Sequence, residues 1–340
     1  MKRLFLVFVS LLFIAQTVLA ADIEVLPTMQ SKAGMQNRVW VGTFQLAWND
    51  LMDRLAFGKV KFAEGTPDIA NDLNMRAFNS EQLSSKYYYK YYGKITKNTK
   101  KQIGTAIRKK FGEVSDILEE TYMPPDKDGY IIYAMLKKKF KFVHSFDKLG
   151  WYSFKNSEVE YFGVNGSSDE RIRKGVTVLF YNFPNEYAVL LDTAENDEVY
   201  LYKTSNAKPF NFIYKDMVKK RQLYEGNTEF ASIDELKIPT LKFFEEKSFD
   251  ELTNKRIKGT KCKIDKALET VKFEMNNEGA DLKSEAKIVV TETSALPDEN
   301  FVKPTPRYFN FDDTFVMFIK EKGKSRPYFA LRVHDIESFR

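Results

Sequence analysis

Two runs of alternating apolar and polar residues lie on either side of Gly279. The first run is Val271–Met275, and the second continues from Ala280 to Val290. In the second run, one side holds Ala280, Leu282, Ser284, Ala286 and Ile288, and the other side holds Asp281, Lys283, Glu285 and Lys287. A period of two is typical of strands with one buried face, so strands are predicted on both sides of Gly279. The charged side is expected to face solvent.

The features that follow Gly279 resemble the C-terminal part of serpins. A polar loop with Pro297, Pro304 and Pro306 leads to the apolar run Phe311–Ile319. In serpins, a strand of the central sheet ends in an acidic hinge with a glycine, and an exposed reactive-centre loop follows it. Asn277-Glu278-Gly279 occupies the position of that hinge.

Other segments resemble serpin strands and follow the order of the family. They are Asn37–Thr43, Ile131–Asp147, Val176–Leu191, Leu236–Phe243 and Tyr328–Val333. The sequence departs from the family pattern at Tyr133, Phe142, Thr314 and Leu331, which leaves the mobility of the central sheet open. The resemblance implies an α+β, serpin-like fold with a large central mixed or antiparallel β-sheet, helices packed on that sheet, and an exposed loop near the C-terminus. The alternative is an unrelated α+β protein rich in strands.

The N-terminal half of the chain has helical patterns. Thr43 is predicted to cap a helix, in which Phe44, Trp48, Leu51 and Leu55 recur at helical spacing and are expected to be core residues. Helical patterns continue to about Glu120, and strands dominate from Gly129 onward.

The first twenty residues have the pattern of a secretory signal. Lys2 and Arg3 precede the short apolar run Leu4–Ala15, and small residues follow up to Ala20. We therefore expect residues 1–20 to be removed, and residues 21–340 to form a single serpin-like domain without a membrane span. The only cysteine, Cys262, excludes an internal disulfide. An exported chain of this kind fits a bacterial protein that is secreted or held in the periplasm or cell envelope.

The loop after Gly279 carries the most concrete function that the resemblance implies. In inhibitory serpins, a protease cleaves this loop while covalently attached to it, and the hinge then inserts into the central sheet. The implied hinge residues are Glu278, Gly279, Ala280, Leu282, Ser284 and Ala286, and the family's spacing places the bait bond at Thr293–Ser294. A target protease is then the partner. Lys283 and Glu285 replace residues that favour fast insertion, so a fixed strand followed by an ordinary loop is the alternative.

A basic stretch between residues 86 and 110 is the second candidate site. It contains no acidic residue and begins with five tyrosines among residues 87–92. The candidate polyanion-binding residues are Lys94, Lys97, Lys100, Lys101, Arg108, Lys109 and Lys110. A cluster of one sign attracts polyanions, so an anionic polysaccharide is the expected partner, and a merely solvated helix face is the alternative. Lys137, Lys138, Lys139 and Lys141 are predicted to extend this patch.

Enzymatic functions are disfavoured. His144 and His334 are the only histidines, so a His/Cys metal site is not expected, and no phosphate-binding or dinucleotide-binding motif is present. No catalytic residue and no cofactor are therefore predicted. The formal net charge of +6 does not indicate a nucleic-acid partner, and a monomer is expected. The candidate functions are suicide-substrate inhibition of a protease, a non-inhibitory serpin-fold binding protein that uses the basic face, and a secreted hydrolase or wall-binding protein of another fold.

Overall fold

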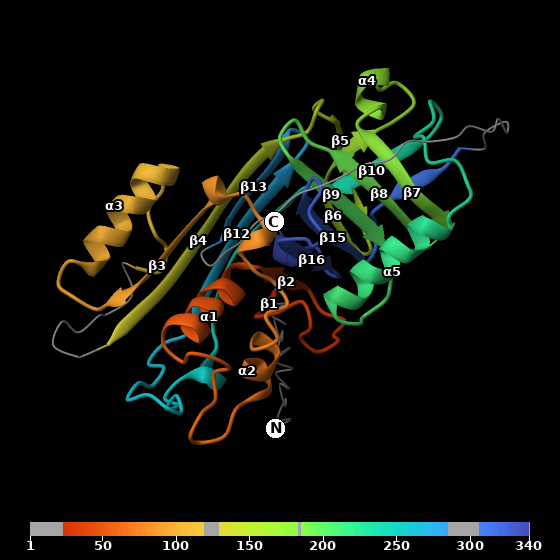
Figure 1. Ribbon diagram of the computed structural model, residues 1–340. Helices are drawn as coiled ribbons and strands as arrows, with labels where there is room; N and C mark the ends of the chain where they lie inside the picture. Colours follow the sequence, from red (N-terminus) through yellow and green to blue (C-terminus); the bar gives the residue numbers. More distant parts are fainter. Residues whose placement is uncertain (1–22, 119–128, 183–184, 285–305, 340) are drawn as a thin grey trace, which may run out of the picture.

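The computed structural model of the chain describes residues 23–118, 129–182, 185–284 and 306–339. Within these ranges the molecule consists of three β-sheets with helices packed on them (Figure 1). The predicted α+β class with a large mixed sheet is confirmed.

One sheet has five antiparallel strands in the order β11-β12-β13-β4-β3. Their bounds are Leu241–Ser248 (β11), Leu268–Asn276 (β12), Gly279–Ser284 (β13), Tyr130–Lys141 (β4) and Tyr88–Lys94 (β3). The strands β12 and β13 form the hairpin that the alternation around Gly279 predicts, with Asn276 opposite Gly279. β13 is the middle strand of this sheet.

A mixed sheet of seven strands has the order β1-β2-β16-β15-β9-β8-β7. Its strands are Glu24–Leu26 (β1), Arg38–Val41 (β2), Val176–Asn182 (β7), Glu186–Asp192 (β8), Asp197–Lys203 (β9), Phe315–Glu321 (β15) and Phe329–Val333 (β16). Every residue of β15 and β16 is buried, because these strands are covered on both faces. A third sheet has the order β14-β10-β6-β5, with bounds Tyr308–Asn310, Glu235–Pro239, Ser157–Val164 and Asp147–Phe154.

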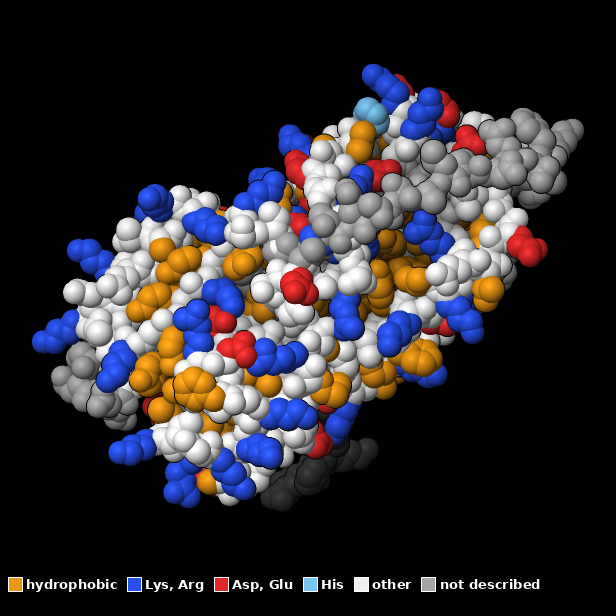
Figure 2. Space-filling view, in the orientation of Figure 1, with side chains coloured by type: hydrophobic (Ala, Val, Ile, Leu, Met, Phe, Trp, Pro, Cys, Tyr) orange, Lys and Arg blue, Asp and Glu red, His pale blue; other side chains and the backbone are white. Residues whose placement is uncertain are grey.

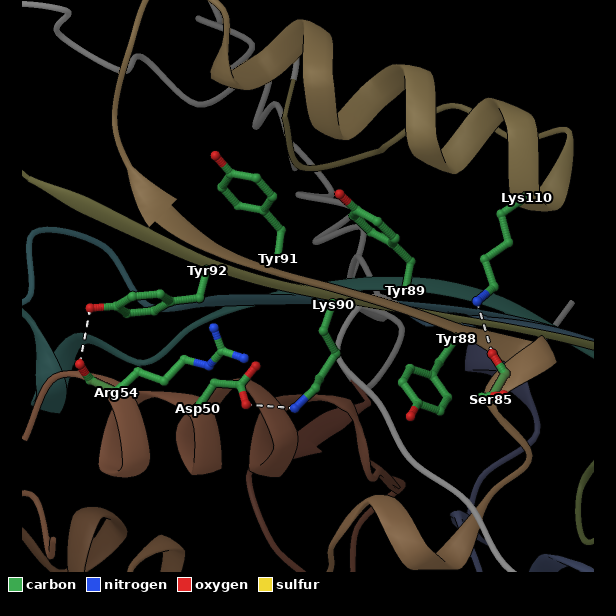
Figure 3. A pocket seen from close by; sticks show the side chains of 9 residues that line it. All are labelled: Asp50, Arg54, Ser85, Tyr88, Tyr89, Lys90, Tyr91, Tyr92 and Lys110. Atoms are coloured by element: carbon green, nitrogen blue, oxygen red, sulfur yellow. Dashed lines mark hydrogen bonds and ion pairs between the residues drawn. The ribbon is translucent and has the colours of Figure 1, made fainter. Parts of the chain in front are cut away.

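The helices are α1 (Thr43–Arg54), α2 (Asp68–Leu73), α3 (Thr99–Phe111), α4 (Glu170–Arg173) and α5 (Phe210–Leu223). Short 3₁₀ turns are η1 (Ser80–Gln82), η2 (Ser85–Tyr87), η3 (Asp250–Leu252) and η4 (Glu337–Phe339). In Figures 1 and 3, α1 and α3 lie on opposite faces of the five-stranded sheet. α5 packs on the seven-stranded sheet, where the Tyr214 ring contacts Tyr200 and Phe318. Among the described residues, no helix combines the length and apolarity needed to cross a bilayer.

The helix predicted after Gly42 is present, and its apolar side forms part of the core. Phe44, Trp48 and Leu51 are buried together with Ala134 of β4, so Trp48 is a core residue as expected. The prediction that Thr43 caps the helix is wrong. Gly42 occupies the cap position, and the Thr43 side chain bonds to the five-stranded sheet instead.

The helical prediction also fails between residues 88 and 94, which form β3. Tyrosine favours strands because its broad side chain packs well on a pleated sheet. Here Tyr88–Lys94 pairs along its whole length with β4, so tertiary pairing decides the conformation.

Candidate functional site

The hinge predicted from the sequence is the start of β13. Asn277 and Glu278 form the turn after β12, and Gly279 begins a strand that pairs on both edges. Opposite Gly279 lie Asn276 of β12 and Lys141 of β4. The turn is further anchored because Phe142 and Phe146 donate backbone hydrogen bonds to the carbonyls of Glu278 and Asn277. The hinge therefore forms the middle of the sheet. Ala286, Thr293 and Ser294 lie outside the described residues.

The inward side of β13 is buried as its alternation suggests. Ala280 is 5% exposed, and Leu282 and Ser284 are fully buried. The Ser284 hydroxyl lies 2.8 Å from the Thr43 hydroxyl at the start of α1, and it also donates to the Thr270 carbonyl of β12. These hydroxyl contacts tie the end of β13 to the helix beneath the sheet.

The outward side of β13 is not simply solvated, which corrects the prediction for Lys283. This lysine is 5% exposed because the segment that follows α3 covers it. Its ammonium group lies 2.7 Å from Asp116 Oδ2 and donates to the Val114 carbonyl at 2.9 Å. Lys137 of the neighbouring strand extends the network, since it lies 2.8 Å from both Glu113 and Asp281. Charges thus join β13, β4 and the covering segment.

The two strands beside β13, β4 and β12, extend beyond the end of their pairing with β13 at Ser284. β13 faces residues 136–141 of β4 and 271–276 of β12. Residues 130–135 of β4 and 268–270 of β12 have, on the edges that face each other, no strand partner within the described ranges. Glu269, in this part of β12, is fully buried, and burial raises its pKa well above the usual value.

The basic stretch is divided among η2, β3 and α3 rather than forming one helix. Its tyrosines alternate across β3, as Figure 3 shows. Tyr89 and Tyr91 point toward α3, and Tyr88 and Tyr92 point toward α1. On the α3 side, Ile103 and Ile107 pack against Tyr89 and Tyr91, which fixes the helix on the sheet.

A cavity of about 440 Å³ opens beside β3. The residues that line it are Asp50, Arg54, Ser85, Tyr88, Tyr89, Lys90, Tyr91, Tyr92 and Lys110 (Figure 3). Lys90 is neutralised by Asp50 at 2.5 Å, and the Tyr92 hydroxyl donates to the Arg54 carbonyl. Arg54 lies over the Tyr92 ring, 5.5 Å from its centroid. The sequence indicated the tyrosines as part of the basic stretch but predicted no cavity, and Asp50 and Arg54 of α1 gave no signal.

The side chains of the candidate polyanion-binding residues do not all point to the same side of the molecule. Lys101, Arg108 and Lys109 are exposed on the side of α3 that faces away from the sheet, and Lys97 is exposed in the preceding loop. None of the four forms an ion pair with another described residue. Figure 2 shows Lys and Arg side chains scattered among uncharged and hydrophobic ones at this end of the molecule. Lys94 ends β3, and Lys100 is half-buried at the start of α3.

Lys110 is oriented differently from the other basic residues of α3. Its ammonium group turns back toward η2 and donates to the Ser85 carbonyl at 2.8 Å, and burial lowers its pKa.

The lysine run 137–139 does not extend the basic surface, contrary to prediction. Lys138 is completely buried, and its ammonium group lies 2.6 Å from Glu321 Oε1 and 3.0 Å from Asp197 Oδ1. Lys137 is held in the network beside Lys283, and only Lys139 is well exposed. The side chains of a strand alternate between its faces, so one of three consecutive lysines necessarily points into the protein.

The His334 ring contacts the Thr314 hydroxyl at 2.9 Å, and burial lowers its pKa. Within the described ranges no group of three or more His, Cys, Asp or Glu side chains is arranged to hold a metal ion.

No family model matches the sequence, and no curated protein matches it significantly. Solved structures match in fold. Human thyroxine-binding globulin complexed with thyroxine gives a TM-score of 0.50 at 12% identity, covering 88% of this chain and 92% of that chain. Mouse protein-Z dependent protease inhibitor gives 0.51 at 12% identity, covering 88% and 91%, and the cleaved Serpin 42Da gives 0.51 at 11%, covering 88% and 91%. The chain therefore has a serpin-like fold.

Proposed function

We propose that the protein is a non-inhibitory, serpin-like binding protein whose basic α3 surface holds an anionic polysaccharide of the cell envelope. The observation that supports the non-inhibitory role is the pairing of β13 on both edges. Inhibition by the serpin mechanism requires the hinge to enter the sheet after the loop is cut. Gly279–Ser284 already occupies the sheet, and contacts at Lys283 and Ser284 hold it there.

The charges of α3 support the binding role. The first turn of α3 contains Lys100 and Lys101 and no acidic residue. The amino end of a helix carries a partial positive charge, so cations there are unfavourable unless an anion lies close by. A bound polyanion would neutralise these lysines together with Lys97 and Arg108, whose positive charges no described acidic residue pairs with.

The test is charge reversal on α3 followed by chromatography on a heparin column. The variant Lys101→Glu/Arg108→Glu should elute at markedly lower salt than the wild type, because both residues are exposed and project from α3. The matched control is Lys247→Glu/Lys266→Glu, which makes the same change in net charge at exposed positions outside the basic stretch. The control should elute close to the wild type. Equal shifts for both variants would show that only net charge matters and would refute the α3 site.

Suicide-substrate inhibition is the second candidate function. It is favoured by the facing edges of β4 and β12 beyond Ser284, which lack a strand partner among the described residues. The neighbours in fold include a protein named as a protease inhibitor. An inserted strand would lengthen β13, so cleavage within residues 288–303 should then raise the unfolding temperature sharply. An adduct with a serine or cysteine protease that survives boiling in detergent would establish this mechanism.

Clean cleavage without a change in unfolding temperature would instead support the non-inhibitory role. Protein treated with an inactivated protease provides the control.

We also propose that residues 1–20 direct export and that residues 21–340 fold as one domain. N-terminal sequencing of protein recovered from the medium and from the envelope fraction tests the first point, because the mature chain should begin at Ala21. A protease-resistant fragment much shorter than residues 21–340 would contradict the second.

A further inference from the structure

A cavity separate from the one in Figure 3 lies among β2, α1, α5 and the turn between β15 and β16. Its volume is about 320 Å³, at the lower end of the range of small-molecule sites, which is roughly 300–1,000 Å³. Segments that are far apart in the sequence form its walls, including residues 28–30, 77–78 and 325–327. A binding site assembled in this way is fixed by the fold rather than by one flexible loop.

Three buried polar atoms beside this cavity have no hydrogen-bond partner among the described residues. They are Gln30 Oε1, Trp40 Nε1 and Gln45 Oε1, and all three residues line the cavity. Trp40 and Gln45 are 1% exposed, so bulk solvent does not satisfy them. Only seven such side-chain atoms occur in the described ranges, and three of them gather here. Buried polar groups without partners are costly, so their concentration at one cavity indicates a bound group that completes them.

The other groups at the cavity define the character of that bound group. Phe78 packs edge-on against Trp40, with ring centroids 5.2 Å apart, and Tyr214 adds a third aromatic side chain. Lys215 and Arg326 are exposed cations that line the cavity, and no acidic residue does. Neither cation forms an ion pair with a described residue.

We propose that this cavity binds a small planar aromatic molecule that carries an anionic group at one end and a hydroxyl or amide at the other. The ring lies among the aromatic side chains, and the anionic group lies by Lys215 and Arg326. The hydroxyl or amide accepts a hydrogen bond from Trp40 Nε1 and donates one to Gln45 or Gln30. This site is independent of the basic α3 surface, because none of the residues named here belongs to that stretch.

The experiment is a fluorescence titration of the intact chain with two probes. One is 8-anilinonaphthalene-1-sulfonate, and the other is N-phenyl-1-naphthylamine, which has the same rings without the sulfonate. We expect saturable one-site binding of the sulfonate, at least tenfold tighter than binding of the neutral probe. The variant Lys215→Met/Arg326→Met should remove this tenfold preference. The control Lys219→Met/Arg221→Met makes the same charge change on α5 outside the cavity and should keep the preference.

A second variant separates binding from a purely structural role. Trp40→Phe keeps an aromatic ring but deletes the unpaired N–H. It should therefore weaken the binding of 6-hydroxynaphthalene-2-sulfonate, whose hydroxyl lies opposite its sulfonate, several-fold, while leaving the unfolding temperature of the ligand-free protein unchanged or raised. A structural role for Trp40 predicts a lower unfolding temperature.

The proposal is overturned if the sulfonate does not bind saturably, which would leave a cavity filled by water only. It is also overturned if the neutral probe binds as well as the sulfonate, or if the lining and control variants behave alike.

Discussion

Replacing Lys138 by methionine should destabilise the protein by about 3–5 kcal/mol, because the change leaves two carboxylates buried without a cation. Lys138, Asp197 and Glu321 are all at most 1% exposed. The ammonium group also lies 3.5 Å from the centroid of the Tyr87 ring. Methionine is similar in length to lysine, so the lost stability should come from charge rather than from packing.

The magnitude follows from the burial of the whole cluster. An ion pair on the surface contributes only about 0–1 kcal/mol, because water stabilises each charge after the pair is broken. At Lys138 water cannot do so. Glu321 keeps one hydrogen bond from the Ser84 amide, and Asp197 keeps one from the Tyr328 hydroxyl. These bonds do not replace a positive charge. The variant must therefore either keep two buried carboxylates without a cation or protonate them.

The assay is urea unfolding at pH 7, monitored by far-UV circular dichroism. The transition midpoints are compared between variants whose unfolding free energy depends equally on urea concentration. The matched control is Lys139→Met, whose side chain is 71% exposed and lies 3.8 Å from Asp281, and it should change stability by less than about 0.5 kcal/mol. Adding Glu321→Gln to Lys138→Met should restore part of the loss by removing one buried charge. Equal midpoints for the Lys138 and Lys139 variants would refute the reasoning.

Further predictions concern pH, the tether of β13 and the turn before it. Burial raises the pKa of Asp197 from 3.8 to about 6, so the folded protein binds this proton more tightly, and its contribution to stability grows as pH falls from 7 toward 4. Relative to Asp197→Asn, the wild type should therefore gain about 1 kcal/mol between pH 7 and pH 5 in urea unfolding, and parallel curves would contradict this. A double-mutant cycle with Lys283→Met and Asp116→Asn should give a coupling energy of about 1–3 kcal/mol, whereas additive effects would mean that the covering segment does not tether β13. Gly279→Ala would place Cβ 2.1 Å from a backbone carbonyl of β4 and should lower the unfolding temperature strongly, whereas Gly104→Ala, with open space around it in α3, should raise stability by roughly 0.5–1 kcal/mol.

The strands near Gly279 could be predicted because the alternation of apolar and charged residues matches the buried and exposed sides of a strand. Ala280, Leu282 and Ser284 alternate with charged residues, and the structure buries that side of β13 against α1. The order of strand-like segments along the chain also pointed to the observed serpin-like fold. The alternation needs only neighbouring residues, whose spacing is fixed by the backbone, whereas the fold came from the resemblance of segments spread over the whole chain.

The buried lysines could not be predicted, because what permits their burial lies far away in the sequence. Lys138 is neutralised by Asp197 and Glu321, and Lys283 is covered by the segment around Asp116. A lysine in a charged run looks solvated unless its partners are known.

The cavity at Trp40 is invisible in the sequence for a similar reason. Its walls come from segments that meet only after α1 and α5 have packed with the seven-stranded sheet. The strand conformation of the β3 tyrosines likewise depends on pairing with β4 rather than on local preference.

The position of β16 has a consequence for the order in which the chain acquires structure. β16 lies between β2 and β15, so β2, from the beginning of the chain, has only β1 beside it until β16 has left the ribosome. The β1–β2 pair therefore cannot join the rest of the seven-stranded sheet before β16 has been synthesised. Until then the free edge of β2 is open to chaperones and to mispairing with other strands.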